Sequence, residues 1–504
     1  NPDFDPWKIA IVGSGPSGCY TAKYLNSKLE GSQIDVLDRL PTPYGLVRNG
    51  VAPDHPEVKN VENDFDTLFE GNDDGHNLNF YGNVKVGTDI SLKELREMYD
   101  VVVLAYGCES DKPFDFIKNS NLEGILSARE FVSWYNGHVD YEWVGPLVEK
   151  ALKRNSDGSQ QIVVIGHGNV ALDCARILAK TREELDPTDI ASRSLNIIDQ
   201  GDDNADFMRE VSVIGRRGHV QGAFTIKELR ELTRLDDATF VVRADELDMG
   251  RTEASEKEIK DTRPRKRMDK LLTDASVSTK DNDSQKKATV HLRFLLNPVG
   301  FETEDGSSLS HITCERTRLV GDAGSQSAEG TGEMEAIKAQ LVSDNSLARN
   351  AAPRVRSHIL SKALVSIGYK GIAIPGTEGW YDEKRGVLKN THGLIEGSKE
   401  DLGGLYVSGW LKRGPSGIIG TNISDAKDTV ASILHALKSA SMDPKERSKS
   451  VYETLKGKGL NPVDWDGYRR VDAEERSENR RRNDFQPREK ICSRDEQLKL
   501  ALSS

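Results

Sequence analysis

Two glycine-rich stretches carry the residues most able to do chemistry. Residues 13–18 read Gly-Ser-Gly-Pro-Ser-Gly after the apolar run 8–12, and residues 166–171 read Gly-His-Gly-Asn-Val-Ala after the apolar run 161–165. In such a motif the first glycine permits a tight turn, and the second lets a pyrophosphate approach the backbone. The third glycine lets helix and strand pack closely, and in the second stretch Ala171 takes its place. The following helix N-terminus offers free N–H groups to the phosphates. Each stretch therefore predicts a dinucleotide site. The first site would be formed by Gly13, Gly15 and Gly18, and the second by Gly166 and Gly168.

Opposite charges follow the two motifs. Asp38 ends the strand expected at 34–37, twenty positions after Gly18, where a carboxylate accepts from ribose hydroxyls. The strand expected at 211–214 is followed by Arg216 and Arg217, which favour a 2′-phosphate. An FAD in the first site and an NADPH in the second are the economical interpretation, although a solvated turn would also explain the arginine pair.

A third glycine loop occupies residues 413–420 and precedes a run with helical apolar spacing from Ala426 to Leu437. A helix N-terminus there would stabilise negative charge on a reduced flavin. An ordinary turn before a capped helix is the alternative.

The elements that must position these residues are those of an α/β enzyme. A chain of 504 residues exceeds the size of one hydrophobic core, so two or more domains are expected. We expect buried strands at 8–12, 34–37, 101–105, 161–165 and 211–214, a helix at 16–29 and a stiff proline loop at 41–45. Residues 185–206 are expected to be a polar surface insertion, residues 249–289 partly helical and partly mobile, and the charged tail 472–490 to wrap the surface.

Composition excludes several function classes. No apolar run approaches the ~18 residues that span a bilayer, and a net charge of −12 argues against nucleic acid as a partner. Five scattered cysteines without a C-x-x-C pattern suit a reducing compartment, and ten histidines without H-E-x-x-H give no sign of a metal site.

Taken together, the motifs resemble the adrenodoxin reductase family, the NADPH–ferredoxin reductases that supply electrons to cytochromes P450 and to iron–sulfur assembly. The resemblance is carried by residues 13–18, 44–60, 127–129, 134–137, 168–173, 215–218, 224–230, 409–417, 471–475 and 487–490. It implies two Rossmann-like domains. The FAD domain is discontinuous, over 1–112 and 371–504, and the NADP domain is inserted at 113–370.

The resemblance also implies site residues. FAD is expected at Ser17, Asp38, Leu46, Val86, Trp410, Gly417, Ile418 and Ile419, and NADPH at Gly168, Asn169, Val170, Arg216, Arg217, Glu228 and Gly417. His55 and Glu228 match a polar pair beside the flavin that tunes proton traffic and ring position. Asp38 departs from the family's usual glutamate and His167 from its common glutamine.

The implied reaction passes hydride from NADPH to FAD and then single electrons to an acidic [2Fe-2S] ferredoxin. An acidic reductase must concentrate positive charge locally to dock such a partner, and the candidates are Arg230, Arg263, Arg265, Lys266 and Arg267. A solvated charge run is the alternative. The resemblance further implies the mitochondrial matrix. We also expect a monomer, with peripheral association with the inner membrane open, and no targeting segment in this chain.

Three rival functions stay open at this point. A pyridine nucleotide–disulfide reductase needs a redox-active cysteine pair, and the small subunit of glutamate synthase needs a cysteine-rich segment; neither pattern is present. A non-catalytic NADPH-binding flavoprotein would need neither the flavin loop nor Glu228.

Overall fold

A computed structural model describes residues 7–70, 77–112, 125–152, 159–199, 208–278, 286–303, 309–338, 363–398, 404–439 and 450–503. The chain forms two compact units. The first contains residues 1–112, 136–140 and 369–504, and the second contains residues 113–135 and 141–368. The first unit therefore holds both ends of the chain, and the second is inserted between them.

The first unit is built on a seven-stranded sheet of order β18-β19-β20-β4-β1-β2-β3, in which the five strands from β20 to β3 run parallel. Their apolar runs are buried on both faces: Ile9 and Ile11 join one core cluster, and Ala10 and Val12 join another. The strands are β1 Lys8–Val12, β2 Gln33–Leu37, β3 Asn77–Tyr81, β4 Val101–Leu104, β18 Asn390–Thr391, β19 Leu394–Ile395 and β20 Gly404–Val407. The strands expected at 8–12, 34–37 and 101–105 are confirmed.

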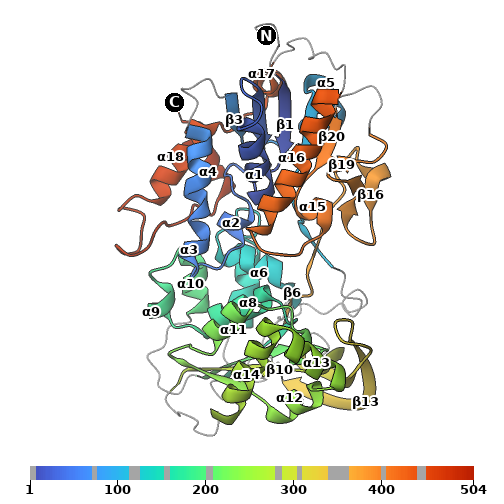
Figure 1. The fold of residues 1–504 in the computed structure, drawn as a ribbon. Helices are drawn as coiled ribbons and strands as arrows, with labels where there is room; N and C mark the ends of the chain where they lie inside the picture. Colours follow the sequence, from blue (N-terminus) through green and yellow to red (C-terminus); the bar gives the residue numbers. More distant parts are fainter. Residues whose placement is uncertain are drawn as a thin grey trace, which may run out of the picture. The chain divides into compact units, whose positions relative to one another are not determined.

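Two long helices of the first unit pack against each other, α1 (Pro16–Asn26) and α16 (Thr421–Ser439), and they lie side by side in Figure 1. The helix expected to reach residue 29 ends at Asn26, because the backbone turns there and both Lys28 and Leu29 donate to the carbonyl of Leu25. The other elements are α2 Leu46–Asn49, α3 Pro56–Lys59, α4 Val61–Glu70, α5 Leu92–Met98, α15 Trp410–Arg413, α17 Val451–Gly457, α18 Trp465–Glu475, α19 Arg494–Ala501, η3 Glu378–Trp380 and the short pairs β5 Ser110–Asp111 with β15 Tyr369–Lys370 and β16 Tyr381–Asp382 with β17 Val387–Leu388.

The charged tail does not simply wrap the surface, as was expected. Arg488 and Lys490 are 5% and 2% exposed. Arg488 donates to Glu62 at 2.8 Å, and Lys490 donates to the backbone carbonyl of Arg48 at 3.1 Å. Arg48 in turn pairs with the fully buried Glu475 at 2.5 Å. For these residues the expectation was wrong, because Glu62 and Arg48, from another part of the chain, compensate the charges of Arg488 and Glu475 inside the unit.

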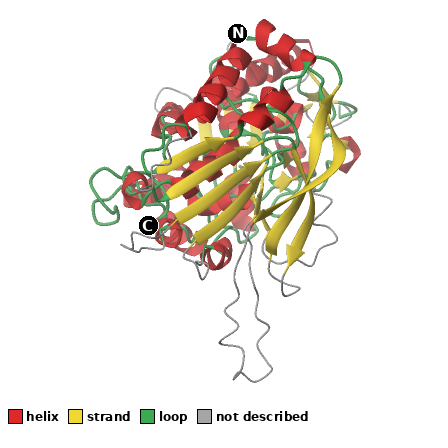
Figure 2. Cartoon of the chain, turned by 90° about the horizontal axis from the view of Figure 1, so that it is seen from below, coloured by secondary structure: helices red, strands yellow, loops and turns green. Residues whose placement is uncertain are grey.

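The second unit is built on a six-stranded parallel sheet of order β6-β14-β7-β8-β10-β9 (Figure 2). Its strands are β6 Ile125–Ser127, β7 Ser159–Ile165, β8 Met208–Ile214, β9 Ala238–Val242, β10 Ala288–Arg293 and β14 Ala363–Val365. The helices around it are α6 Ala128–Tyr135, α7 Val144–Ala151, α8 Asn169–Ala179, α9 Arg182–Leu185, α10 Ser192–Ile198, η2 His219–Gln221, α11 Ile226–Leu232, α12 Ala244–Gly250, α13 Glu253–Asp261 and α14 Arg263–Ser278.

A three-stranded antiparallel sheet completes the second unit, with strands β11 Leu296–Thr303, β12 Leu309–Val320 and β13 Ser327–Lys338. The polar stretch from residue 320 to 345 supplies the edge strand β13, and residues 339–345 lie outside the described part of the chain. The expected helical character of 249–289 is confirmed by α13 and α14, whereas its expected mobility falls on residues 279–285, which are not described.

Residues 185–206 were expected to be a surface insertion, and for their first half this is wrong. Leu185, Ile190, Leu195 and Ile198 are buried in the main core cluster of the second unit. Helix α10 presents Leu195 and Ile198 at i and i+3, and the polar residues 192–194 in its first turn mask this apolar face in the sequence. Residues 200–206 lie outside the described residues.

Candidate dinucleotide sites

The first glycine loop is shaped as a phosphate cradle. Gly13 has φ +106°, and a Cβ there would lie 2.6 Å from the carbonyl oxygen of Ala105. A Cβ on Gly18 would lie 1.8 Å from the carbonyl oxygen of Gly13, so the helix can approach the strand only without a side chain. Gly15 caps the N-terminus of α1, and a Cβ there would meet its nearest neighbour, the Cα of Gly45, only at 4.0 Å. The open position is the one at which a pyrophosphate approaches the backbone.

Asp38 is fixed at the end of β2 by three hydrogen bonds. Its Oδ2 accepts from the Ser14 backbone N–H at 2.9 Å and from the Ser14 hydroxyl at 2.6 Å. Its Oδ1 accepts from the Leu40 N–H at 2.9 Å. The carboxylate is therefore pre-oriented beside the glycine loop, and its remaining lone pairs suit ribose hydroxyls.

The stiff loop at residues 41–45 packs on the same cradle. Tyr44, in the left-handed region with φ +80°, donates its N–H to the Ser14 carbonyl at 3.0 Å. Leu46 follows at the start of α2 and is partly exposed, whereas Val86 is buried in the same core cluster as Val12 and Leu37, the last residues of β1 and β2. Both predicted flavin residues thus belong to this end of the sheet.

The residues on either side of the third glycine loop contact Ser17 of the first loop. Ser17 donates to Asn422 Oδ1 at 2.9 Å, and a Cβ on Gly409 would lie 1.8 Å from the Ser17 hydroxyl. Trp410 stacks on Tyr369 with ring centroids 5.5 Å apart. The predicted flavin contacts Gly417, Ile418 and Ile419 lie in the turn before α16, and Ile418 is 66% exposed. The sequence prediction of a helix N-terminus here is confirmed.

The second glycine loop repeats this geometry in the other unit. Gly166 has φ +137°, and a Cβ there would lie 2.1 Å from the Ser366 carbonyl oxygen. Gly168 caps α8, and a Cβ there would have no heavy atom within 4 Å, so this second cradle is also open. Asn169 begins α8, and its Oδ1 accepts from the Thr225 N–H at 2.8 Å. Val170, the next predicted contact, is half-buried on the same turn.

Residues 215–218, called the arginine loop below, follow β8 and are braced by the antiparallel sheet. Thr317 on β12 donates its hydroxyl to the Arg216 carbonyl at 2.6 Å, and the Leu295 N–H donates to the Arg217 carbonyl at 3.3 Å. The side chains of Arg216 and Arg217 are exposed, and neither forms an ion pair with the described residues. Thr317 has no motif around it, so sequence reasoning missed this brace.

His167, between the two glycines of the second loop, is held neutral. Its ring packs against Phe294 with centroids 4.9 Å apart. Burial lowers its pKa to about 4, and the nearby charge of Arg217 acts in the same direction. The arginine loop therefore gains no further charge from this histidine near neutral pH.

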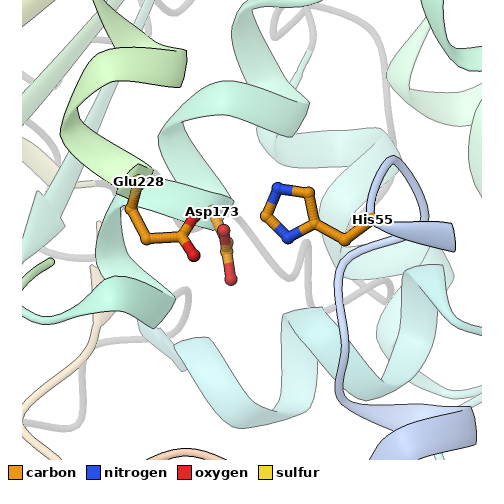
Figure 3. A group of neighbouring side chains, drawn as sticks. All are labelled: His55, Asp173 and Glu228. Atoms are coloured by element: carbon orange, nitrogen blue, oxygen red, sulfur yellow. The ribbon is translucent and has the colours of Figure 1, made fainter. Parts of the chain in front are cut away.

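Glu228, on α11, belongs to a cluster of acids around one buried arginine. Figure 3 shows its carboxyl group next to that of Asp173, with an oxygen of each within 4.8 Å of the other. Arg176, 2% exposed, lies 2.8 Å from Asp173 and 3.4 Å from Glu228. Burial, followed by the charge of Asp173, raises the pKa of Glu228 to about 8. This carboxyl group can hold a proton at neutral pH.

His55 lies in the first unit, immediately before α3, and is 7% exposed. Because Glu228 lies in the second unit, the predicted pairing of His55 with Glu228 stays a prediction.

The predicted docking cations divide into two groups. Arg230 on α11, together with Arg263, Lys266 and Arg267 on α14, is exposed. Arg265 is half-buried and donates to the backbone carbonyl of Gly222 at 2.7 Å. Among the described residues, no helix is long and apolar enough to cross a membrane.

Comparisons with known proteins agree with this geometry. Residues 7–234 match the model of the pyridine nucleotide-disulphide oxidoreductase family. The chain is 39% identical to the mitochondrial NADPH:adrenodoxin oxidoreductase of Arabidopsis thaliana, over 98% of this chain and 95% of the relative, and 36% identical to that of Homo sapiens, over 98% and 91%. A solved structure of Mycobacterium tuberculosis FprA in complex with NADPH matches with a TM-score of 0.81 at 34% identity, covering 99% of this chain and all of FprA.

Proposed function

The chain belongs to the NADPH:adrenodoxin oxidoreductase family, and we propose that it is an FAD-containing reductase that takes electrons from NADPH and delivers them to a ferredoxin. The observation that carries the proposal is the contrast between the two glycine cradles. One is closed by a hydrogen-bonded carboxylate, Asp38, and the other by two exposed guanidiniums, Arg216 and Arg217. Unlike dinucleotides suit such unlike sites.

The residues present fit both cofactors. Gly15 and Gly168 each leave open space at a helix N-terminus, which a pyrophosphate needs. In the first unit we assign FAD to Gly13, Gly15, Ser17, Gly18 and Asp38, to Leu46 and Val86, and to Trp410, Gly417, Ile418 and Ile419. In the second unit we assign NADPH to Gly166, Gly168, Asn169, Val170, Arg216, Arg217 and Glu228.

Bound FAD supplies the chemistry, since it accepts a hydride from NADPH and releases electrons one at a time. The chain itself supplies binding, orientation and proton control. Asp38 fixes the ribose of the flavin nucleotide, and the arginine loop selects the phosphorylated coenzyme. Glu228, whose pKa is raised to about 8 by burial, can donate a hydrogen bond to a polar group of the nicotinamide while it is protonated. We propose that His55 serves the same reaction by tuning proton traffic at the flavin.

For the partner, we propose an acidic [2Fe-2S] ferredoxin that docks on the exposed cations Arg230, Arg263, Lys266 and Arg267. In a chain of net charge −12, a local group of exposed cations can attract an acidic protein and raise its association rate. The double reversal Arg263→Glu with Arg267→Glu should slow ferredoxin reduction steeply at low salt and leave NADPH-to-ferricyanide turnover normal. Equal losses in both assays would remove the docking proposal.

We propose that the protein is a monomer and that it is located in the mitochondrial matrix. The localisation is supported by the plant and human relatives, which are named mitochondrial, although a 35% identical relative is the bacterial FprA of Mycobacterium tuberculosis. Immunoblotting of the endogenous protein in subcellular fractions tests this placement, because the protein should follow a marker of the mitochondrial matrix.

The rival disulfide reductase has little support from the cysteines. All five are free thiols. Burial raises the pKa of the Cys108 thiol to about 12 and that of the Cys19 thiol well above its ordinary value, which is opposite to the low pKa of a reactive thiolate.

Cytochrome c reduction by NADPH tests the proposed function. The purified enzyme should reduce cytochrome c slowly alone and many-fold faster when a [2Fe-2S] ferredoxin is added. A rate that does not respond to ferredoxin at any concentration contradicts the proposed acceptor.

A further inference from the structure

Helix α14 turns one of its cations toward the coenzyme side of the second unit. Arg265, Met268 and Leu272 are spaced i, i+3 and i+7, and Met268 and Leu272 are 3% and 0% exposed in the core. Arg265 shares this inward face. By contrast, Arg263, Lys266 and Arg267 are exposed. A run of basic residues that looks uniform in sequence is thus divided by the helix.

The inward cation reaches the segment that continues the arginine loop. Arg265 donates from one terminal nitrogen to the backbone carbonyl of Gly222 at 2.7 Å. The next residue, Ala223, donates its N–H to the His167 carbonyl at 2.8 Å, so this segment is hydrogen-bonded to the second glycine loop. Arg265 therefore contacts the wall of the NADPH site proposed above, with further guanidinium N–H donors available for a ligand.

The arginine loop carries two positive charges, those of Arg216 and Arg217, that no acid among the described residues pairs. Burial lowers the pKa of Arg265, the charge of Glu258 raises it in part, and the charge of Arg217 lowers it further, so Arg217 lies close enough to act on Arg265. A nearby arginine behaves differently: Arg251 is paired with Asp248 at 2.8 Å and with Asp269 at 2.9 Å. Cations that repel one another in a folded protein mark a place for an anion.

We propose that Arg265 is a third cation of the site for the 2′-phosphate of NADPH, acting with Arg216 and Arg217, and not a member of the ferredoxin-docking surface. The inference rests on the proposed function, because it assigns the phosphate of the proposed coenzyme. The glycine loop at residues 166–168 is the place for the pyrophosphate, so the phosphate left for the arginines is the one on the ribose.

The test measures binding of two nucleotides that differ by one phosphate, 2′,5′-ADP and 5′-ADP, to the flavin-loaded enzyme by calorimetry. Arg265→Gln should weaken 2′,5′-ADP about tenfold, the loss of roughly one charge-assisted contact, and change 5′-ADP less than twofold. Arg265→Lys, which keeps the charge, should recover part of the loss. The matched control is Arg267→Gln, two residues further along the same helix and exposed, which should leave both nucleotides unchanged.

The KM for ferredoxin at low salt should distinguish the two variants in the opposite sense. It should rise in Arg267→Gln and stay unchanged in Arg265→Gln. Unchanged binding of 2′,5′-ADP in Arg265→Gln would overturn the proposed role of Arg265. Equal weakening of both nucleotides would overturn it too, because it would show that Arg265 only supports the backbone at Gly222. These failures differ from failure of the proposed function, in which NADPH would not reduce the flavin of the parent enzyme.

Discussion

Replacing both arginines of the arginine loop should change which coenzyme the enzyme uses. In Arg216→Ala with Arg217→Ala, the backbone of the loop keeps its support, because Thr317 and Leu295 contact carbonyl groups and not the guanidiniums. Neither arginine has an ion partner among the described residues, so their removal strands no buried charge. The substitution should therefore affect binding and not folding.

The magnitude follows from the exposure of the two side chains. A charge-assisted hydrogen bond contributes about 1.5–3 kcal/mol. Because Arg216 and Arg217 are exposed and screened by salt, the lower value applies to each. Two such contacts give about 3 kcal/mol, or about a 100-fold loss in kcat/KM for NADPH. NADH lacks the 2′-phosphate, so its kcat/KM should stay within about threefold of the parent value.

Ferricyanide reduction measures this effect without a ferredoxin, at several NADPH and NADH concentrations and fixed salt. The matched control is Arg263→Ala with Arg267→Ala, which removes the same charge from the same unit and should leave both coenzymes unaffected. Equal losses in kcat/KM for NADPH and NADH in the arginine-loop variant, or a parent enzyme that already prefers NADH, would contradict the assignment of Arg216 and Arg217 to the 2′-phosphate.

Three further predictions concern the support of the site. Thr317→Val should raise the NADPH KM about three- to fivefold and lower the free energy of unfolding by about 1 kcal/mol, with Thr317→Ser near normal. The pKa of Glu228 is raised from 4.5 to about 8, so the folded state loses stability as pH rises through that range. Glu228→Gln should therefore reduce the fall in Tm between pH 6 and pH 8.5. The same variant should slow flavin reduction. Glu475→Gln should cost about 3–5 kcal/mol in denaturant unfolding because it leaves Arg48 buried without its counter-charge, while Arg480→Gln, in a more exposed pair, should cost under about 1 kcal/mol.

Much of the fold could be predicted because its strands are short apolar runs that stop at glycine. The strands before Gly13 and Gly166 are found where they were expected, and both glycines have a positive φ that disfavours other residues. The position of Asp38 directly after β2 could be predicted as well, since its distance from the glycine motif is set by one helix and one strand; its contact with the ribose stays a prediction. These features depend on residues that are close together in the sequence, so they can be read from a single segment of the chain.

What sequence reasoning missed depends on contacts between distant segments. Thr317 braces the arginine loop from 101 positions away, and nothing in its neighbours marks it. Arg488 was expected at the surface because its own segment is charged, but its partner Glu62 lies 426 positions earlier. Arg265 was grouped with its exposed neighbours because composition does not reveal which face of a helix is buried.

The most direct test of the account is to mix the purified flavin-loaded enzyme with NADPH in the absence of oxygen and record its absorption spectrum. The oxidised flavin bands should bleach with one equivalent of NADPH, and far more slowly with NADH. Adding oxidised ferredoxin should then restore them. A protein that binds no FAD on reconstitution, or whose flavin is not bleached by NADPH, would contradict the account.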